Sequence, residues 1–189
     1  MKQTPEELWK EAVNGNQESW SKLYELFGAR LYNFFLKNTQ NSEFAADKVQ
    51  EVFLKIYRHK ENFQYGTLKT WIFRIAKNIL IDEWRKSKNK EILSEMTFDV
   101  KDEVTSVEGE VLNSIDQSCL KEIVDEGMHL LPQEERLTIG LIYLAGLPVP
   151  EFAKIMGIPL GTAKTRIRAA RIKLDRILNE KMKLKNMVV

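Results

Sequence analysis

A run of basic side chains near the end of the sequence has the spacing of one helix face. In residues 161–174, Lys164, Thr165, Arg168 and Arg171 fall away from an apolar stripe at helical spacing. The free N–H groups of the first helical turn can bind a phosphate, and Thr162 can add a hydroxyl. Cations at the start of such a helix can also reach base edges in a major groove. This segment could therefore recognise a nucleic acid.

The residues before this helix have the pattern needed to position it. A short helix over 150–156 is predicted to end at Gly157, which can take the positive φ of a tight turn. Ala153 is small where two helices must cross closely. Pro132 predicts the start of a preceding helix that runs to about Ala145. An ordinary amphipathic helix pair explains the same pattern, but the order of small residue, turn glycine and basic helix favours a DNA-binding helix-turn-helix.

A second basic segment, residues 67–88, has aromatic side chains among its cations. The cations are Lys69, Arg74, Lys77, Arg85, Lys86 and Lys88, and the aromatic residues are Trp71, Phe73 and Trp84. Such a mixture suits unpaired bases and backbone phosphates. A core helix with its aromatic residues inside and its lysines outside is the preferred interpretation of the pattern alone.

A third face is polar and lies opposite an apolar stripe. Asp47, Gln50, Glu51 and Leu54 stand at i, i+3, i+4 and i+7. They predict a polar patch with one exposed leucine. A solvated face and a docking face remain equal interpretations of this pattern.

The elements that carry these faces are all predicted to be helices. Apolar stripes at spacings of three and four recur, and no convincing alternating strand pattern is present. Thr4 with Glu7, and Ser42, are expected N-caps. We therefore predict an all-α fold with two small helical domains, residues 1–88 and 116–185, joined by an acidic linker over 89–115. The predicted core stripe of the last helix is Leu160, Ala163, Ile167, Ala170, Leu174 and Ile177.

The composition excludes several classes of protein. The chain has 189 residues, 43% of them hydrophobic and 30% charged, which is typical of a globular protein. Its single cysteine, Cys119, cannot form an internal disulfide, and His59 and His129 lack metal-ligand spacing. With no phosphate-binding glycine loop or nucleophile motif, we expect no catalytic site, metal or cofactor. Without a secretory signal or a long apolar run, we expect a cytoplasmic protein that does not insert into a membrane.

Three segments resemble a known family. Residues 45–57, AADKVQEVFLKIY, and 70–86, TWIFRIAKNILIDEWRK, resemble region 2 of bacterial sigma factors, and residues 131–174 resemble region 4. Their order and the acidic linker resemble the extracytoplasmic-function (ECF) group of the sigma-70 family. The resemblance implies a transcription initiation factor without enzymatic activity of its own, which binds core RNA polymerase, directs it to promoter DNA and helps to open the duplex.

The resemblance also implies roles for individual residues. The helix over 45–57 would dock on the clamp helices of the polymerase β′ subunit through Asp47, Gln50, Glu51 and Leu54. The loop over 62–67 and the helix after it would read the −10 element, with Asn78 on an unpaired base and Arg74, Lys77 and Arg85 on phosphates. The −35 element would be read through Thr162, Lys164, Thr165, Arg166, Arg168 and Arg171. The polymerase β subunit and an anti-sigma factor are further expected partners.

The sequence departs from the family at the predicted −35 reader. Many members have valine at the position of Ala163, serine at Thr165 and arginine at Ala169. Two other interpretations compete with the sigma factor. A helix-turn-helix regulator that binds duplex DNA without polymerase leaves the first half unexplained, and a pure interaction module leaves the basic helix unexplained.

Overall fold

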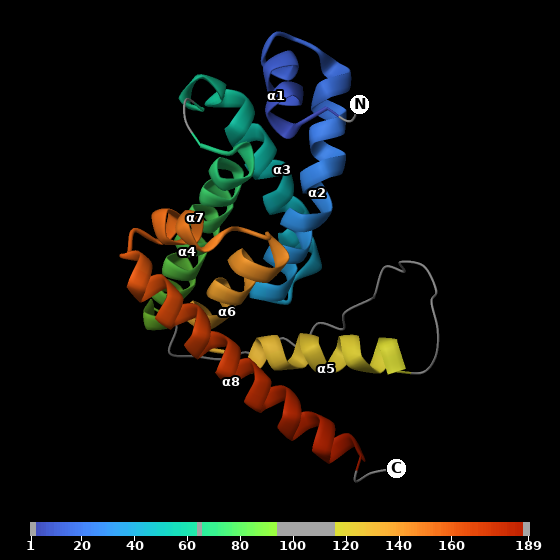
Figure 1. Cartoon of the computed structure of the whole chain (residues 1–189), viewed down its shortest axis with the longest axis vertical. Coiled ribbons are helices and arrows are strands. Elements are labelled where there is room, and N and C mark those ends of the chain that lie inside the picture. The colour runs from blue at the N-terminus through green and yellow to red at the C-terminus, as the bar shows by residue number, and fades with distance from the viewer. Residues whose placement is uncertain (1–2, 64–65, 94–115, 187–189) are drawn as a thin grey trace. The chain divides into compact units, whose positions relative to one another are not determined.

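The computed structural model describes residues 3–63, 66–93 and 116–186, and the regular elements in these ranges are all helices (Figure 1). The chain divides into two compact units, residues 1–102 and 103–189. The predicted all-α, two-domain organisation is therefore confirmed. Most of the predicted linker, residues 94–115, lies outside the described residues, and the last helix of the first unit continues beyond residue 88.

The described part of the first unit contains four α-helices and one turn of 3-10 helix. They are α1 (Pro5–Val13), α2 (Gln17–Thr39), α3 (Ser42–Arg58), η1 (Lys60–Asn62) and α4 (Leu68–Leu93). The capping box predicted for Thr4 and Glu7 begins α1. The N-cap predicted at Ser42 is wrong by one residue. Asn41 caps α3, because its side-chain oxygen accepts a hydrogen bond from the Phe44 N–H at 2.7 Å.

An aromatic core holds α2 against α3 and α4. Phe34 of α2 lies 5.4 Å from Phe35 and 5.8 Å from Phe73 of α4, in edge-to-face contacts between ring centroids. All three rings are fully buried, so Phe73 belongs to the core, as the core-helix interpretation expects. Tyr24 stands at the helical spacing of this apolar stripe but is 50% exposed, and it packs on Phe53 of α3 at the surface.

The described part of the second unit contains four α-helices and a short π-helical segment. Its elements are α5 (Asp116–Leu130), α6 (Gln133–Ile139), η2 (Gly140–Leu144), α7 (Val149–Met156) and α8 (Leu160–Asn186). The helix predicted from Pro132 to about Ala145 therefore has its expected extent but not one geometry, because its last turn is π-helical. There the Ala145 N–H bonds the Gly140 carbonyl at 2.9 Å. Gly146, with φ +65°, follows at the predicted end.

The core of this unit lies between α5, α6 and α8. Met128, Leu131, Ile139 and Ala170 are buried, with Leu174 and Ile177 packed against them. The predicted stripe of α8 is wrong at its first position, since Leu160 is 44% exposed. No described helix combines the length and the apolar character that crossing a membrane requires.

Candidate functional site

The predicted helix-turn-helix consists of α7, the turn at Gly157 and α8. Gly157 takes the left-handed conformation, with φ 66° and ψ 35°, and ends α7. Phe152 and Ala153 of α7 are buried, and so is Ala163 of α8. Ala163 is fully buried, and its short side chain allows α7 and α8 to approach closely. The first turns of α8 are thus held by their apolar side, and their other side faces solvent.

The six residues of α8 that were predicted to contact −35 DNA fall into two groups in the structure. Five of them are exposed: Thr162, Lys164, Thr165, Arg168 and Arg171. Arg166 instead turns towards α6, where its guanidinium pairs with the Glu134 carboxylate at 3.7 Å and its side chain is 31% exposed. Lys173 of α8 similarly pairs with Glu135 at 3.1 Å. These ion pairs link α8 to α6, and the sequence pattern did not reveal them.

A cavity of about 400 Å³ opens in the first unit between α3, η1 and α4. Its lining comprises Lys55, His59, Asn62, Trp71, Ile75, Asn78 and Asp82. The structure therefore brings together two parts of the predicted −10 reader, Asn62 and Asn78, with an indole ring beside them. Two residues of the predicted loop, Gln64 and Tyr65, lie outside the described residues.

Three cations stand on α4 near this cavity. Arg74 and Arg85 are exposed, and Arg85 pairs with Asp82 at 3.6 Å. Lys77 is half-buried. Burial lowers the pKa of the Lys77 ammonium from its ordinary value, repulsion from Arg74 and Arg85 lowers it further, and Asp82 opposes them. An arriving phosphate would relieve this repulsion.

The predicted docking face on α3 is mostly open to solvent. Asp47 and Gln50 are exposed, and the Leu54 side chain remains 54% exposed although it is apolar. Tyr57, one turn further along, is 56% exposed and packs beside Trp20 of α2. Sequence periodicity did not single out Tyr57, whose exposure extends the apolar part of this face.

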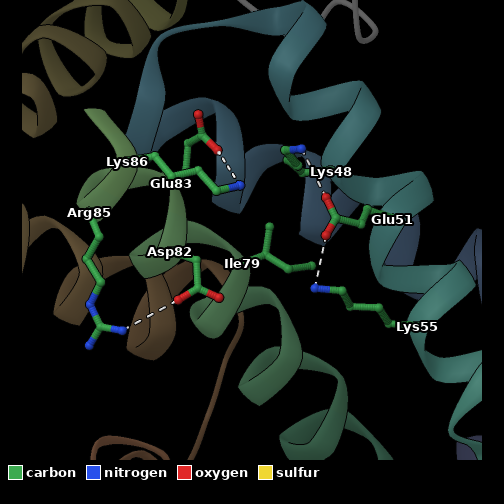
Figure 2. A pocket seen from close by; sticks show the side chains of 8 residues that line it. All are labelled: Lys48, Glu51, Lys55, Ile79, Asp82, Glu83, Arg85 and Lys86. Carbon is green, nitrogen blue, oxygen red and sulfur yellow. Dashed lines mark hydrogen bonds and ion pairs between the residues drawn. The ribbon is translucent and has the colours of Figure 1, made fainter. Parts of the chain in front are cut away.

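Glu51 is less exposed than the other three docking residues, and it shares the Lys48 ammonium with Asp47, which pairs with it at 3.0 Å. It lines a second cavity of about 320 Å³ between α3 and α4, where its carboxylate is 3.0 Å from both Lys48 and Lys55 (Figure 2). Burial raises the Glu51 pKa, but hydrogen bonds from the two ammonium groups outweigh it and hold the pKa below its ordinary value. At neutral pH the carboxylate is ionised and already paired within α3.

The described residues contain no group of three or more His, Cys, Asp or Glu side chains placed to hold a metal ion. What the described surfaces offer is a polar and apolar face on α3, an amide-lined cavity beside three cations on α4, and an exposed basic face on α8. Surfaces of this kind are able to bind macromolecules.

The comparisons with known proteins agree with this arrangement. Residues 23–90 match the family model of Sigma-70 region 2, and residues 121–174 match Sigma-70, region 4. SigW of Bacillus subtilis, an ECF RNA polymerase sigma factor, is 30% identical, with 90% of this chain and 95% of SigW covered. The ECF RNA polymerase sigma-E factor of Haemophilus influenzae is 31% identical, with coverage of 89% and 92%.

Solved structures show the same fold. The sigma factor RpoE of Bartonella quintana, in complex with the anti-sigma factor NepR, has a TM-score of 0.70 at 24% identity, covering 86% of this chain and 98% of that one. CnrH, in complex with the cytosolic domain of CnrY, has a TM-score of 0.66 at 22% identity, with coverage of 92% and 96%.

The two matched regions define a sigma-70-type initiation factor, in which one helical domain precedes a helix-turn-helix domain. This chain belongs to the ECF RNA polymerase sigma factors. It therefore acts in promoter-specific transcription initiation, as predicted. A regulator that works without polymerase does not account for the match over region 2.

Proposed function

We propose that this sigma factor opens promoters by capturing an unpaired −10 base in the cavity lined by Asn62, Trp71 and Asn78. The juxtaposition of two amides and an indole in that cavity carries the proposal. An Asn amide offers both donors and an acceptor to a base edge, and an aromatic face can stack on a base. Unstacking costs a few kcal/mol per step, and binding of the extruded base offsets it. No nucleotide hydrolysis is needed.

Arg74, Lys77 and Arg85 would hold the phosphates of the captured strand. They lie on the helix that carries Asn78, and two of the three are exposed. On α8, the exposed residues Lys164, Thr165 and Arg168 would read the −35 element in the major groove. Arg166 would contribute chiefly by orienting the helix through Glu134 rather than by contacting a base.

The Lys77 assignment predicts a separation of stability from binding. In the Lys77→Gln variant, we expect circular dichroism to remain that of the parent, because glutamine keeps a polar, flexible side chain at this half-buried position of α4. Binding of the holoenzyme to single-stranded −10 DNA should weaken, with the salt slope reduced by about 0.7 for one lost phosphate contact. Anisotropy titrations at several salt concentrations measure this slope. An unchanged slope would remove Lys77 from the phosphate contacts.

Core polymerase would bind through the α3 face, with Asp47, Gln50 and Leu54 on the β′ clamp helices. Leu54→Glu should weaken core binding by about tenfold or more, because a charge would replace a desolvated apolar contact. Since Leu54 is already 54% exposed, circular dichroism should remain that of the parent. Met182→Glu, at another 42% exposed apolar position, is the matched control and should bind core normally. Equal affinity of the two variants would exclude Leu54 from the interface.

An anti-sigma protein is a further partner that we propose. RpoE and CnrH, which share the fold, are each described in complex with such a protein or with a cytosolic partner domain. The half-exposed side chains of Leu54 and Tyr57 offer an apolar surface for which it could compete with core polymerase. A co-purified inhibitor should displace core polymerase from the parent, and its own binding to Leu54→Glu should be weaker than to Met182→Glu. Equal binding to the two variants would exclude this surface.

A further inference from the structure

We infer that helix α1 positions the base-binding cavity, with Glu6 and Trp9 as positioning residues that do not contact DNA. The inference rests on the proposed function of that cavity. Neither residue lines the cavity itself, whose walls come from α3, η1 and α4. Both, however, contact the segments that carry its walls.

The first contact joins α1 to the beginning of α4. The Glu6 carboxylate accepts a hydrogen bond from the Leu68 N–H at 3.0 Å, across 62 residues of sequence. Leu68 is the first residue of α4, so its N–H has no partner within the helix. A carboxylate at this end is also favoured by the helix dipole. Two residues on, the Thr70 N–H bonds the Thr67 hydroxyl at 3.3 Å. The first turn of α4 is thus capped partly by its own chain and partly by α1.

The second contact is aromatic and joins Trp9 of α1 to Phe63, which follows η1, and to Trp71 of α4. The Trp9 ring is 4% exposed, and its centroid lies 5.9 Å from that of Phe63 and 5.3 Å from that of Trp71. Phe63 and Trp71 also contact each other at 5.5 Å. Phe63 directly follows Asn62, and Trp71 itself lines the cavity. One buried indole therefore holds two neighbouring parts of the cavity wall together.

Through these contacts, α1 influences the distance between the Asn62 and Asn78 amides. Asn78 follows Trp71 on α4 by about two helical turns, so its position depends on where α4 begins and how it is tilted. The position of Asn62 depends on its neighbour Phe63, whose ring packs against the ring of Trp9. Moving α1 would change the separation of the two amides, and misplacing a binding group by a fraction of an ångström weakens recognition.

Glu6 has a neighbour that serves as a matched control. Glu7 lies in the same first turn and caps α1 itself, since its carboxylate accepts from the Thr4 N–H at 2.8 Å. Glu7→Ala therefore weakens α1 while the hydrogen bond between Glu6 and Leu68 remains possible. Glu6→Ala removes the bond to Leu68, and Glu6→Gln keeps an oxygen that can accept it.

The test uses the full chain reconstituted with core polymerase and a fluorescent single-stranded oligonucleotide. The oligonucleotide carries the −10 non-template sequence of a promoter that the parent transcribes. We expect Glu6→Ala to weaken its binding about fivefold, as loss of one hydrogen bond allows. Glu6→Gln and Glu7→Ala should stay within about twofold of the parent. Core affinity and binding to a −35 duplex should not change in any of them.

A double variant shows whether Glu6 acts through the cavity. If it does, Glu6→Ala combined with Asn78→Ala should weaken binding by less than the product of the two single effects. If the two effects on binding multiply fully, the positioning role is wrong. It is also wrong if Glu6→Ala and Glu7→Ala weaken binding equally and in proportion to their decreases in Tm. If Asn78→Ala weakens binding and Glu6→Ala does not, the inference is wrong while the cavity function stands. If neither does, the cavity function itself is wrong.

Discussion

Replacing Asn78 with alanine is expected to lower the fraction of open complexes on a duplex promoter by about tenfold or more, because one base contact contributes about 1–3 kcal/mol. Asn78 is exposed at the cavity wall, so the substitution should not disturb the fold. Core binding and duplex −35 binding should remain those of the parent. Permanganate reactivity of unpaired thymines measures the opening directly.

A promoter with a pre-melted bubble provides the internal control for Asn78. Part of the lost transcription should return on this template, because unstacking no longer opposes the complex. Asn33→Ala, which removes another exposed asparagine of the same unit, should open promoters normally. If Asn78→Ala opened duplex promoters as well as Asn33→Ala does, the captured base would have to bind elsewhere.

The combined change of Lys164 and Arg168 to alanine should abolish most −35 recognition. Each residue that contacts a base should contribute about 1–3 kcal/mol, so the double variant should lose roughly 2–6 kcal/mol. Because the two positions are one helical turn apart, the losses need not be strictly additive. Both side chains are exposed on α8, so the unfolding of the second unit should change little. Binding to −35 and scrambled duplexes at one salt concentration measures the loss in specificity.

Two arginines on the same helix separate recognition from charge. Arg176→Ala removes an exposed cation beyond the helix-turn-helix and should retain specificity. Arg166→Ala breaks the pair with Glu134 and should affect all sequences alike, through the orientation of α8. Should the Lys164 and Arg168 variants discriminate −35 duplexes as the parent does, another face of the second unit must read the promoter.

Several features of this protein were predictable because they depend on neighbouring residues. The capping box at Thr4 and Glu7 and the left-handed turn at Gly157 are local arrangements. Helical periodicity likewise predicted the buried Ala163 and Ala170. The predicted N-cap of α3 was wrong by one residue, because two neighbouring residues could each cap the helix and Asn41 does so rather than Ser42. Their side chains are both good caps, and the fold selects between them.

The amino-acid sequence by itself determined the class of protein, the helices and the faces that carry its polar residues. Tertiary packing decided which of those residues meet. Arg166 has the type and spacing of a DNA-binding residue, but Glu134 on α6 pairs with it. The pairing of Glu51, by contrast, is local, since Lys48 and Lys55 stand three and four residues away on α3. Periodicity reports which side of one helix is apolar, and it cannot report which residue of another helix lies opposite. For the same reason only the folded chain places Glu6 on Leu68, across 62 residues.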